Sequence, residues 1–196
     1  MLTKKDLYRI IDGLIMDNGF SFGAVNYCVD SVALAKKACR NVKIELLDFK
    51  TINICGILFK TAKSTSIGLN SRRSAAGRNF DCMHELIHYW LHNAESFYCD
   101  QRSQNDMNDY IEWQANEGAA QFLMPYQVFI PAYMRMEEAS ASEDEIVHSL
   151  GRRFNVGGQS VKVRIASLQN EIAQYKNNVP MDKIEILSRR QQMNQI

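Results

Sequence analysis

A His-Glu-x-x-His run, His84-Glu85-Leu86-Ile87-His88, lies inside an uninterrupted helical pattern and constrains this chain more than any other feature. On an α-helix each residue advances about 100°, so side chains four positions apart project from nearly the same face. Their Cβ atoms then lie about 5–6 Å apart, which lets two imidazoles converge on one ion. Glu85 stands beside the pair, where it can take a proton from water. The pattern indicates the active-site helix of a zinc hydrolase.

Two histidines do not complete a catalytic zinc site, which needs a third protein ligand and one open position. Glu112 is the best candidate because it lies on the next predicted helix. Small residues follow it there and allow close packing on the motif helix: Ala115, Gly118, Ala119 and Ala120. Glu117 faces elsewhere on that helix, and Glu95 is expected beyond the end of the motif helix. Glu112 therefore ranks above both.

Three further side chains near the motif are assigned by helical geometry. Asn116, one turn after Glu112, could hold the second ring nitrogen of a ligating histidine. His92 lies about 12 Å along the helix from His84, so the two cannot share an ion. We expect His92 to bond the backbone or an outer partner near the helix end. Cys82 points away from the histidines and is not expected to be a ligand.

The composition excludes several classes of protein. Formal net charge is +1, so no global field draws the chain to nucleic acid or to an anionic membrane. No stretch approaches the roughly 18 apolar residues of a membrane span. The N-terminus leads into an amphipathic segment instead of a signal sequence, and the five scattered cysteines form no Cys-x-x-Cys pair. We expect a cytoplasmic protein with reduced thiols.

The hydrophobic period predicts an α+β fold. Helical patterns cover about 4–17, 30–39, 78–92, 109–123, 142–154 and 159–175, and β patterns cover about 42–46, 52–59 and 64–70. Three strands with short turns indicate an antiparallel or mixed sheet. We expect one domain over 1–138, a helix-turn-helix-like segment packed on it over 139–176, and a peripheral tail over 177–196.

Two runs, Phe80–His92 and Glu112–Pro125, resemble the ImmA/IrrE family of metallo-endopeptidases. They carry a phenylalanine ahead of His-Glu-x-x-His, then Glu-x-x-Ala-Asn and a closing Leu-Met-Pro. The resemblance reaches more weakly over residues 1–170, and departs from the family pattern at Ile87 and Gly118. Neither departure removes a ligand, although the second could alter packing behind Glu112.

The resemblance implies a zincin-like fold, in which a small three-stranded sheet packs on the active-site helix and on a second, ligand-bearing helix, followed by a C-terminal helical segment. It implies His84, His88 and Glu112 as metal ligands. It also implies Glu85 as the catalytic acid–base of peptide hydrolysis. The implied substrate is one specific protein, a transcriptional repressor of the helix-turn-helix class.

The sequence leaves open the oxyanion donor, the strand that binds substrate and the identity of the metal. The donor that stabilises the oxyanion could be any of five side chains: Tyr89, Tyr110, His148, Arg72 or Arg73. The strand at 66–70 could be a sheet edge that binds substrate by strand addition. The donor set favours Zn²⁺ but would also accept Mn²⁺.

A different class of function is regulation by metal or DNA binding without proteolysis. The stretch 142–175 reads as helix–turn–helix and is locally basic, with Arg152, Arg153, Lys162 and Arg164. Gly157-Gly158 is a poor start for a rigid recognition helix. We therefore expect this helix pair to pack against the rest of the protein, and rank nucleic-acid binding below proteolysis.

Overall fold

The computed structural model describes residues 2–23, 26–92, 96–100 and 106–187, with the side chains of 96–100 and 106–108 excepted. Glu95, the expected polar break over 101–105 and the end of the tail at 188–196 lie outside the described residues. The chain forms two compact units. One comprises Met1–Tyr27, Ala120–Phe154 and Gly158–Ile196, and the other comprises Cys28–Ala119 and Asn155–Gly157.

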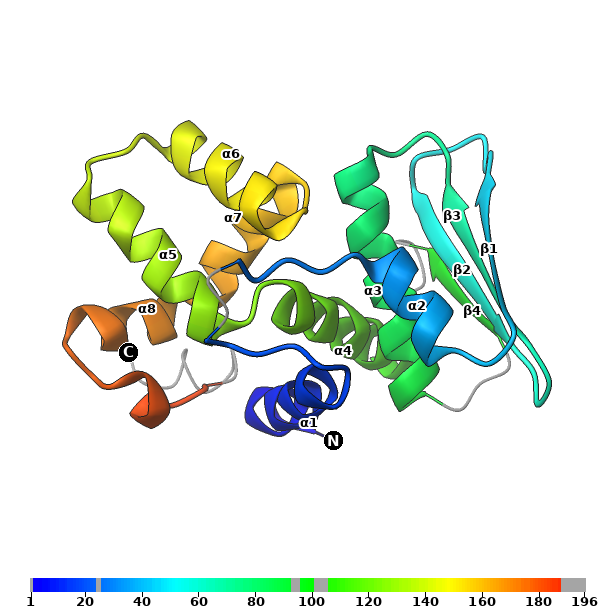
Figure 1. Ribbon diagram of the computed structural model, residues 1–196, viewed down its shortest axis with the longest axis horizontal. Coiled ribbons are helices and arrows are strands. Elements are labelled where there is room, and N and C mark those ends of the chain that lie inside the picture. The colour runs from blue at the N-terminus through cyan, green and yellow to red at the C-terminus, as the bar shows by residue number, and fades with distance from the viewer. Residues whose placement is uncertain (1, 24–25, 93–95, 101–105, 188–196) are drawn as a thin grey trace. The chain divides into compact units, whose positions relative to one another are not determined.

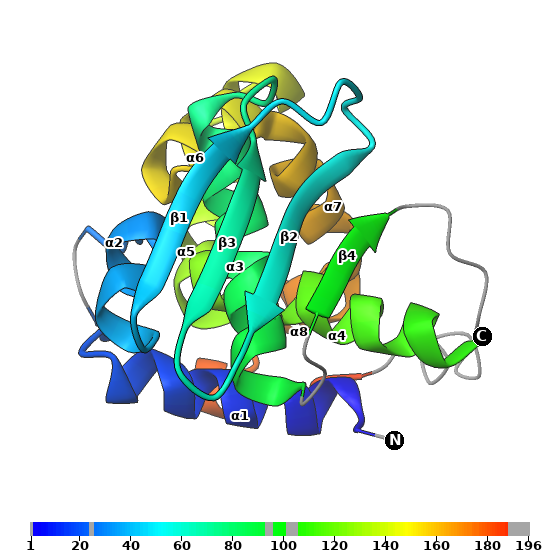
Figure 2. The ribbon, with the colours of Figure 1, turned by 90° about the vertical axis from the view of Figure 1, so that its right-hand side faces the viewer.

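The second unit is built on a mixed sheet of four strands: β1 (Val42–Leu47), β2 (Ile54–Lys60), β3 (Thr65–Asn70) and β4 (Ser96–Asp100). Their order is β1-β3-β2-β4 (Figure 2). β1 pairs with β3 in parallel, whereas β2 is antiparallel to both β3 and β4. The predicted α+β class and mixed sheet are confirmed. The short fourth strand was not predicted, since it lies in a segment rich in polar residues.

The position of β3 corrects one expectation. Ile67 of β3 lies opposite Ile44 of β1 on one side and Leu58 of β2 on the other. β3 is therefore an interior strand, and the prediction that residues 66–70 form a sheet edge is wrong. Alternation of apolar residues fixes which face of a strand is buried, but it does not say which strand becomes its neighbour. The edges of the described sheet are β1 and β4.

Two helices, α2 (Ser31–Ala38) and α3 (Ala75–Leu91), cover one face of this sheet (Figures 1 and 2). α3 begins earlier than the predicted residue 78, because the Ser74 side chain accepts a hydrogen bond from the Gly77 amide at 3.1 Å. Its apolar face is fully buried, with Cys82, Met83, Leu86 and Ile87. The burial of this face fixes the rotation of the helix and so aims the histidines.

α4 (Asp106–Leu123) carries Glu112, and its small residues Ala115 and Ala119 are fully buried. Met124-Pro125 ends the helix, as the restriction on residues before proline predicts. A further helix, α5 (Tyr126–Glu138), follows at once and was not predicted. It contains Pro131, which removes one backbone donor and weakened the helical signal.

The first unit is helical: α1 (Lys4–Asp17), α5, α6 (Glu143–Phe154), α7 (Gly158–Ser167) and α8 (Gln169–Lys176), with a 3₁₀ turn at Met181–Lys183. The capping box of Ser142 and Glu145 forms ahead of α6 as expected. The single helix expected over 159–175 is instead two helices, α7 and α8. At the break between them, the Ser167 carbonyl accepts a hydrogen bond from the Lys4 Nζ atom at 2.7 Å.

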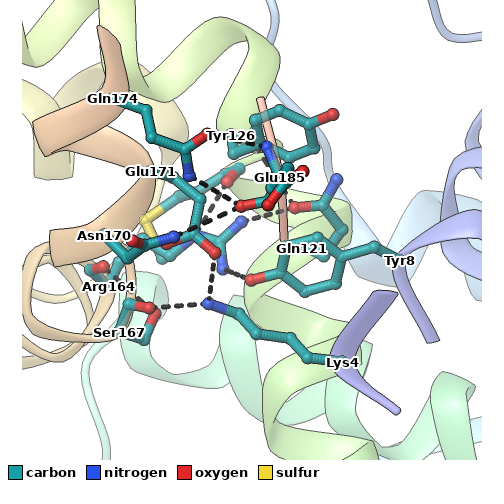
Figure 3. A network of polar contacts seen from close by, with 11 residues as sticks. Lys4, Tyr8, Gln121, Tyr126, Arg164, Ser167, Asn170, Glu171, Gln174 and Glu185 are labelled. Atoms are coloured by element: carbon teal, nitrogen blue, oxygen red, sulfur yellow. Dashed lines mark hydrogen bonds and ion pairs between the residues drawn. The ribbon is translucent and has the colours of Figure 1, made fainter. Parts of the chain in front are cut away.

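A buried polar network ties α7 and α8 to α1 within this unit (Figure 3). Arg164 is fully buried and donates to Tyr8 Oη at 2.6 Å and to the Met124 carbonyl at 3.0 Å. The Lys4 ammonium lies 3.0 Å from the carboxylate of Glu171, which is also fully buried. Arg164, one of the basic residues that suggested DNA binding, is thus part of the core.

Over the part of the chain that the structure describes, no helix combines the length and the apolar character needed to cross a membrane. Among the described cysteines, Cys28, Cys39 and Cys82 are free thiols.

Candidate metal centre

Three side chains from two helices converge in the second unit: His84 and His88 from α3, and Glu112 from α4. The Nε2 atoms of the two histidines are 3.0 Å apart. Glu112 places one carboxylate oxygen 3.2 Å from His84 Nε2 and the other 3.3 Å from His88 Nε2. Among the described residues, this is the one group of His, Cys, Asp and Glu side chains arranged to hold an ion.

The geometry fits a small divalent cation. A tetrahedral ion with ligands at about 2.0–2.1 Å keeps its ligand atoms roughly 3.3 Å apart. The ring nitrogens of His84 and His88 and the Glu112 oxygens are spaced at 3.0–3.3 Å. Two imidazole nitrogens and one carboxylate are the donor set of many catalytic zinc sites, and they would also accept manganese.

A chain of hydrogen bonds holds the outer sides of the histidine rings. His84 Nδ1 lies 3.1 Å from Asn116 Oδ1, so His84 donates there and keeps a lone pair on Nε2. His92 Nε2 lies 2.9 Å from Gln114 Oε1, and His92 Nδ1 lies 2.9 Å from His88 Nδ1. With the Gln114 oxygen as acceptor, His92 accepts from His88 Nδ1–H. Both Nε2 lone pairs then face the candidate ion position.

The contacts of Asn116 and His92 match the positions expected from helical spacing. Gln114 was not singled out by the sequence reasoning. The sequence gives little indication of its role, since a glutamine two residues after Glu112 looks like an ordinary polar residue of a helix. The structure buries it to 6% exposure against His92, and a buried amide needs such a partner.

Glu85 is completely buried, and neither carboxylate oxygen has a hydrogen-bond partner among the described residues. Burial raises its pKa to about 8, a shift that the charges of Glu112 and Asp81 reinforce and that His84 opposes. Leaving a buried carboxylate unpaired is costly, so such groups concentrate at functional sites.

β2 supplies the surface on which the Glu85 side chain rests. Gly56 is so close that an added Cβ would lie 2.7 Å from Glu85 Oε1 and 3.2 Å from its Cγ. Glycine is therefore required here by the approach of the carboxylate. Sequence reasoning missed it, although an isolated glycine inside a β-rich run signals close approach of another group.

Burial and mutual contacts shift the pKa values of all three converging groups, His84, His88 and Glu112. Burial alone would raise the pKa of Glu112, but its hydrogen bonds with the two histidines lower it to about 2. Burial lowers the pKa of His88 to about 4. For His84, burial acts in the same direction, but the hydrogen bond with Glu112 and the Glu85 charge outweigh it and raise the pKa. The two Nε2 atoms face each other at 3.0 Å, so at most one of them carries a proton in the metal-free protein.

Four of the five candidate oxyanion donors lie in this unit, and both arginines are engaged. Arg72 forms two bonds with Asp48, and Arg73 forms two with Asp81. The Tyr89 ring lies under Lys60 Nζ at 4.6 Å, and Tyr110 stacks on Trp113; the fifth candidate, His148, is exposed on α6. The identity of the donor stays a prediction.

A Mycobacterium tuberculosis transcriptional regulator has a similar solved structure, with a TM-score of 0.53 at 19% sequence identity. The similarity covers 84% of this chain, but the chain spans only about half of the regulator, 47% of its length. At this identity the likeness shows the fold alone. No curated protein matches the sequence significantly.

The family comparison is more specific. The model Peptidase_M78, described as the IrrE N-terminal-like domain, matches residues 38–166. That range includes the His-Glu-x-x-His helix and the helix of Glu112, and it covers well over half of the chain. The chain therefore belongs to the IrrE N-terminal-like family of peptidases, as the sequence resemblance implied.

Proposed function

We propose that this protein is a zinc-dependent endopeptidase that cleaves one specific protein substrate. In this proposal His84, His88 and Glu112 hold the ion, and manganese could replace zinc. The Glu85 carboxylate is the catalytic acid–base. One observation carries the proposal: a fully buried carboxylate without a partner among the described residues stands directly beside two convergent imidazoles and an acid.

The residues behind the ligands orient them. Asn116 accepts from the outer nitrogen of His84, and His92 accepts from that of His88. Such bonds fix the tautomer and the ring angle of a ligating histidine. Gln114 sets the tautomer of His92 in turn. The inward nitrogens are thereby prepared to bind a cation before it arrives.

A bound divalent cation would acidify a water molecule and polarise the scissile carbonyl. Glu85 accepts the proton of the attacking water on one carboxylate oxygen and passes it to the nitrogen of the leaving amine. Burial raises the pKa of Glu85 to about 8 in the metal-free protein, and the charge of a bound cation would lower it toward neutrality, which suits a group that must take up and release a proton. Only glycine at position 56 leaves room for this carboxylate, because an added Cβ would lie 2.7 Å from Glu85 Oε1.

The substrate is proposed from the family resemblance to be a repressor of the helix-turn-helix class, met in the cytoplasm. Substrate strand addition, if it occurs, would use an edge strand such as β4 or β1. DNA binding through 142–175 is less well supported, since Arg164 is fully buried and Lys162 is paired with Glu143 at 3.0 Å. Tight duplex binding with a steep salt dependence would reverse that ranking.

The test uses the purified protein, zinc or manganese, and a candidate repressor of the helix-turn-helix class, chosen from those encoded near its gene. We expect one metal equivalent per chain and a single cleavage, detected by mass spectrometry. Glu85→Gln should bind metal and fold normally yet not cleave. Full cleavage by that variant would refute the mechanism, whereas metal binding without any cleavage by the native protein would favour a regulatory role.

Metal binding has its own matched control. Glu112→Gln should weaken zinc binding strongly, because it removes one of three ligands. Glu117→Gln changes the same residue type on the same helix and should leave the affinity unchanged. Equal zinc affinities for the two variants would exclude Glu112 as a ligand.

A further inference from the structure

The helical unit of residues 1–27, 120–154 and 158–196 contains an open cavity of about 690 Å³. α5 and α6 supply most of its wall, and the link between them and the segment before residue 28 supply the rest. This volume lies within the roughly 300–1,000 Å³ typical of small-molecule sites. No residue of the metal centre lines the cavity, so it would be a separate site.

Two arginines line the cavity without a counter-charge. Arg135 comes from the last turn of α5 and Arg153 from the last turn of α6. No aspartate or glutamate is among the described residues that line the wall. Glu137, close to Arg135 on α5, is already engaged by Lys176 Nζ at 2.6 Å and by the Tyr133 hydroxyl at 2.6 Å.

The environment of Arg153 is unusual for a cation. Its Nε is buried and has no hydrogen-bond partner among the described residues, and its guanidinium lies 5.6 Å from the Phe154 ring. Burial lowers its pKa, and the nearby positive charge of Arg135 lowers it further. A buried donor without an acceptor is costly, and an anion between the two guanidiniums would relieve both the desolvation and the repulsion.

Helix electrostatics explain only part of this arrangement. A basic residue in the last turn of a helix is favourable by itself, because it faces the negative end of the helix dipole. That effect does not require the two residues to share one cavity. Three other cations of the unit have an acidic partner: Lys162 pairs with Glu143, Lys176 with Glu137, and Lys4 with Glu171.

We propose that this cavity binds a small organic phosphate monoester. Its head would lie between Arg135 and Arg153, and its body would contact the apolar side chains on the wall, which include Val128, Pro131 and Leu150. A phosphate monoester carries a charge near −2 at neutral pH, which matches two guanidinium groups. Each planar guanidinium can bind two phosphate oxygens side by side.

The experiment titrates phenyl phosphate into full-length protein by calorimetry, with a chelator present so that the metal centre does not bind the phosphate. We expect a Kd below about 1 mM, a value typical of a small ligand with few contacts. Arg135→Gln and Arg153→Gln should each weaken binding at least tenfold, about the loss of one charge-assisted hydrogen bond. Arg152→Gln is the matched control, since Arg152 is exposed on the same helix and should not matter.

Three results would overturn the proposal. They are no binding in the millimolar range, equal binding of neutral phenol, and unchanged affinity in both arginine variants. Binding of a phosphoserine peptide but not of phenyl phosphate would also overturn it, in favour of a protein partner. Thermal unfolding confirms that each variant is folded, and Arg135→Lys, which keeps the charge, should bind more tightly than Arg135→Gln.

Discussion

The contact between Gly56 and Glu85 gives the sharpest test of how the fold positions the proposed catalytic group. In Gly56→Ala the new Cβ would lie 2.7 Å from Glu85 Oε1, against about 3.4 Å or more in ordinary contact. Because Glu85 is fully buried, the carboxylate can move only by displacing its neighbours. Overpacking of this kind costs about 2 kcal/mol, or roughly 4–8 °C in melting temperature for a chain of this size.

The expected kinetic effect is larger than the effect on stability. A shift of the Glu85 carboxylate by about 1 Å should lower the rate of substrate cleavage about 100-fold. Gly68→Ala on β3 is the matched control, because its Cβ would meet Leu47 Cδ1 at 2.7 Å and Ile57 Cγ2 at 2.8 Å, but not Glu85. It should destabilise the fold without a comparable loss of activity. If Gly56→Ala cleaved and melted like the native protein, the inferred packing of Glu85 would be incorrect.

Three further perturbations test the site and its support. Gln114→Leu should lower zinc affinity about 10–100-fold in a chelator competition, because His92 loses its acceptor; an unchanged affinity would exclude this relay. Arg164→Met should lower the free energy of unfolding in urea by about 3–5 kcal/mol, because it leaves buried acceptors unpaired. Exposed Lys162→Met should change it by less than about 1 kcal/mol, and equal losses in the two variants would contradict the buried network. In metal-free protein, Glu112 has a folded pKa of about 2, below its ordinary value, so it stabilises the fold above about pH 4.5 and loses this effect as pH falls toward 2. Glu112→Gln should therefore destabilise the metal-free protein at pH 7 and much less near pH 2.5, as followed by thermal melts. A pH-independent difference would refute this linkage.

The sequence was most informative where one helix carries the whole signal. His84 and His88 are aligned by helical spacing alone, and the chain needs no tertiary information to place them on one face. Glu112 required a second helix to pack at the right rotation, which the small residues of α4 indicated only in outline. The fold class followed from periodicity, while the predicted division at residue 138 stays a prediction.

The features that escaped prediction are those set by contacts distant in sequence. The interior position of β3 depends on β1 joining it in parallel, a pairing that no local pattern encodes. α5 was missed because Pro131 interrupts its pattern, and Gln114 because its partner His92 lies 22 positions away. Gly56 looked like a weak point in a strand until its neighbour was known.

His92 caps the C-terminus of α3. Its amide still donates to the His88 carbonyl at 3.0 Å, but its extended backbone, with φ −120° and ψ 136°, ends the helix there. The ring of His92 then lies between His88 Nδ1 and Gln114 Oε1, each at 2.9 Å. The end of α3 and the buried amide of α4 thus act together to orient the His88 ring, while Asn116 orients the His84 ring directly. The orientation of the two imidazoles is therefore shared between the two helices, and a change in their packing would disturb both inward nitrogens at once.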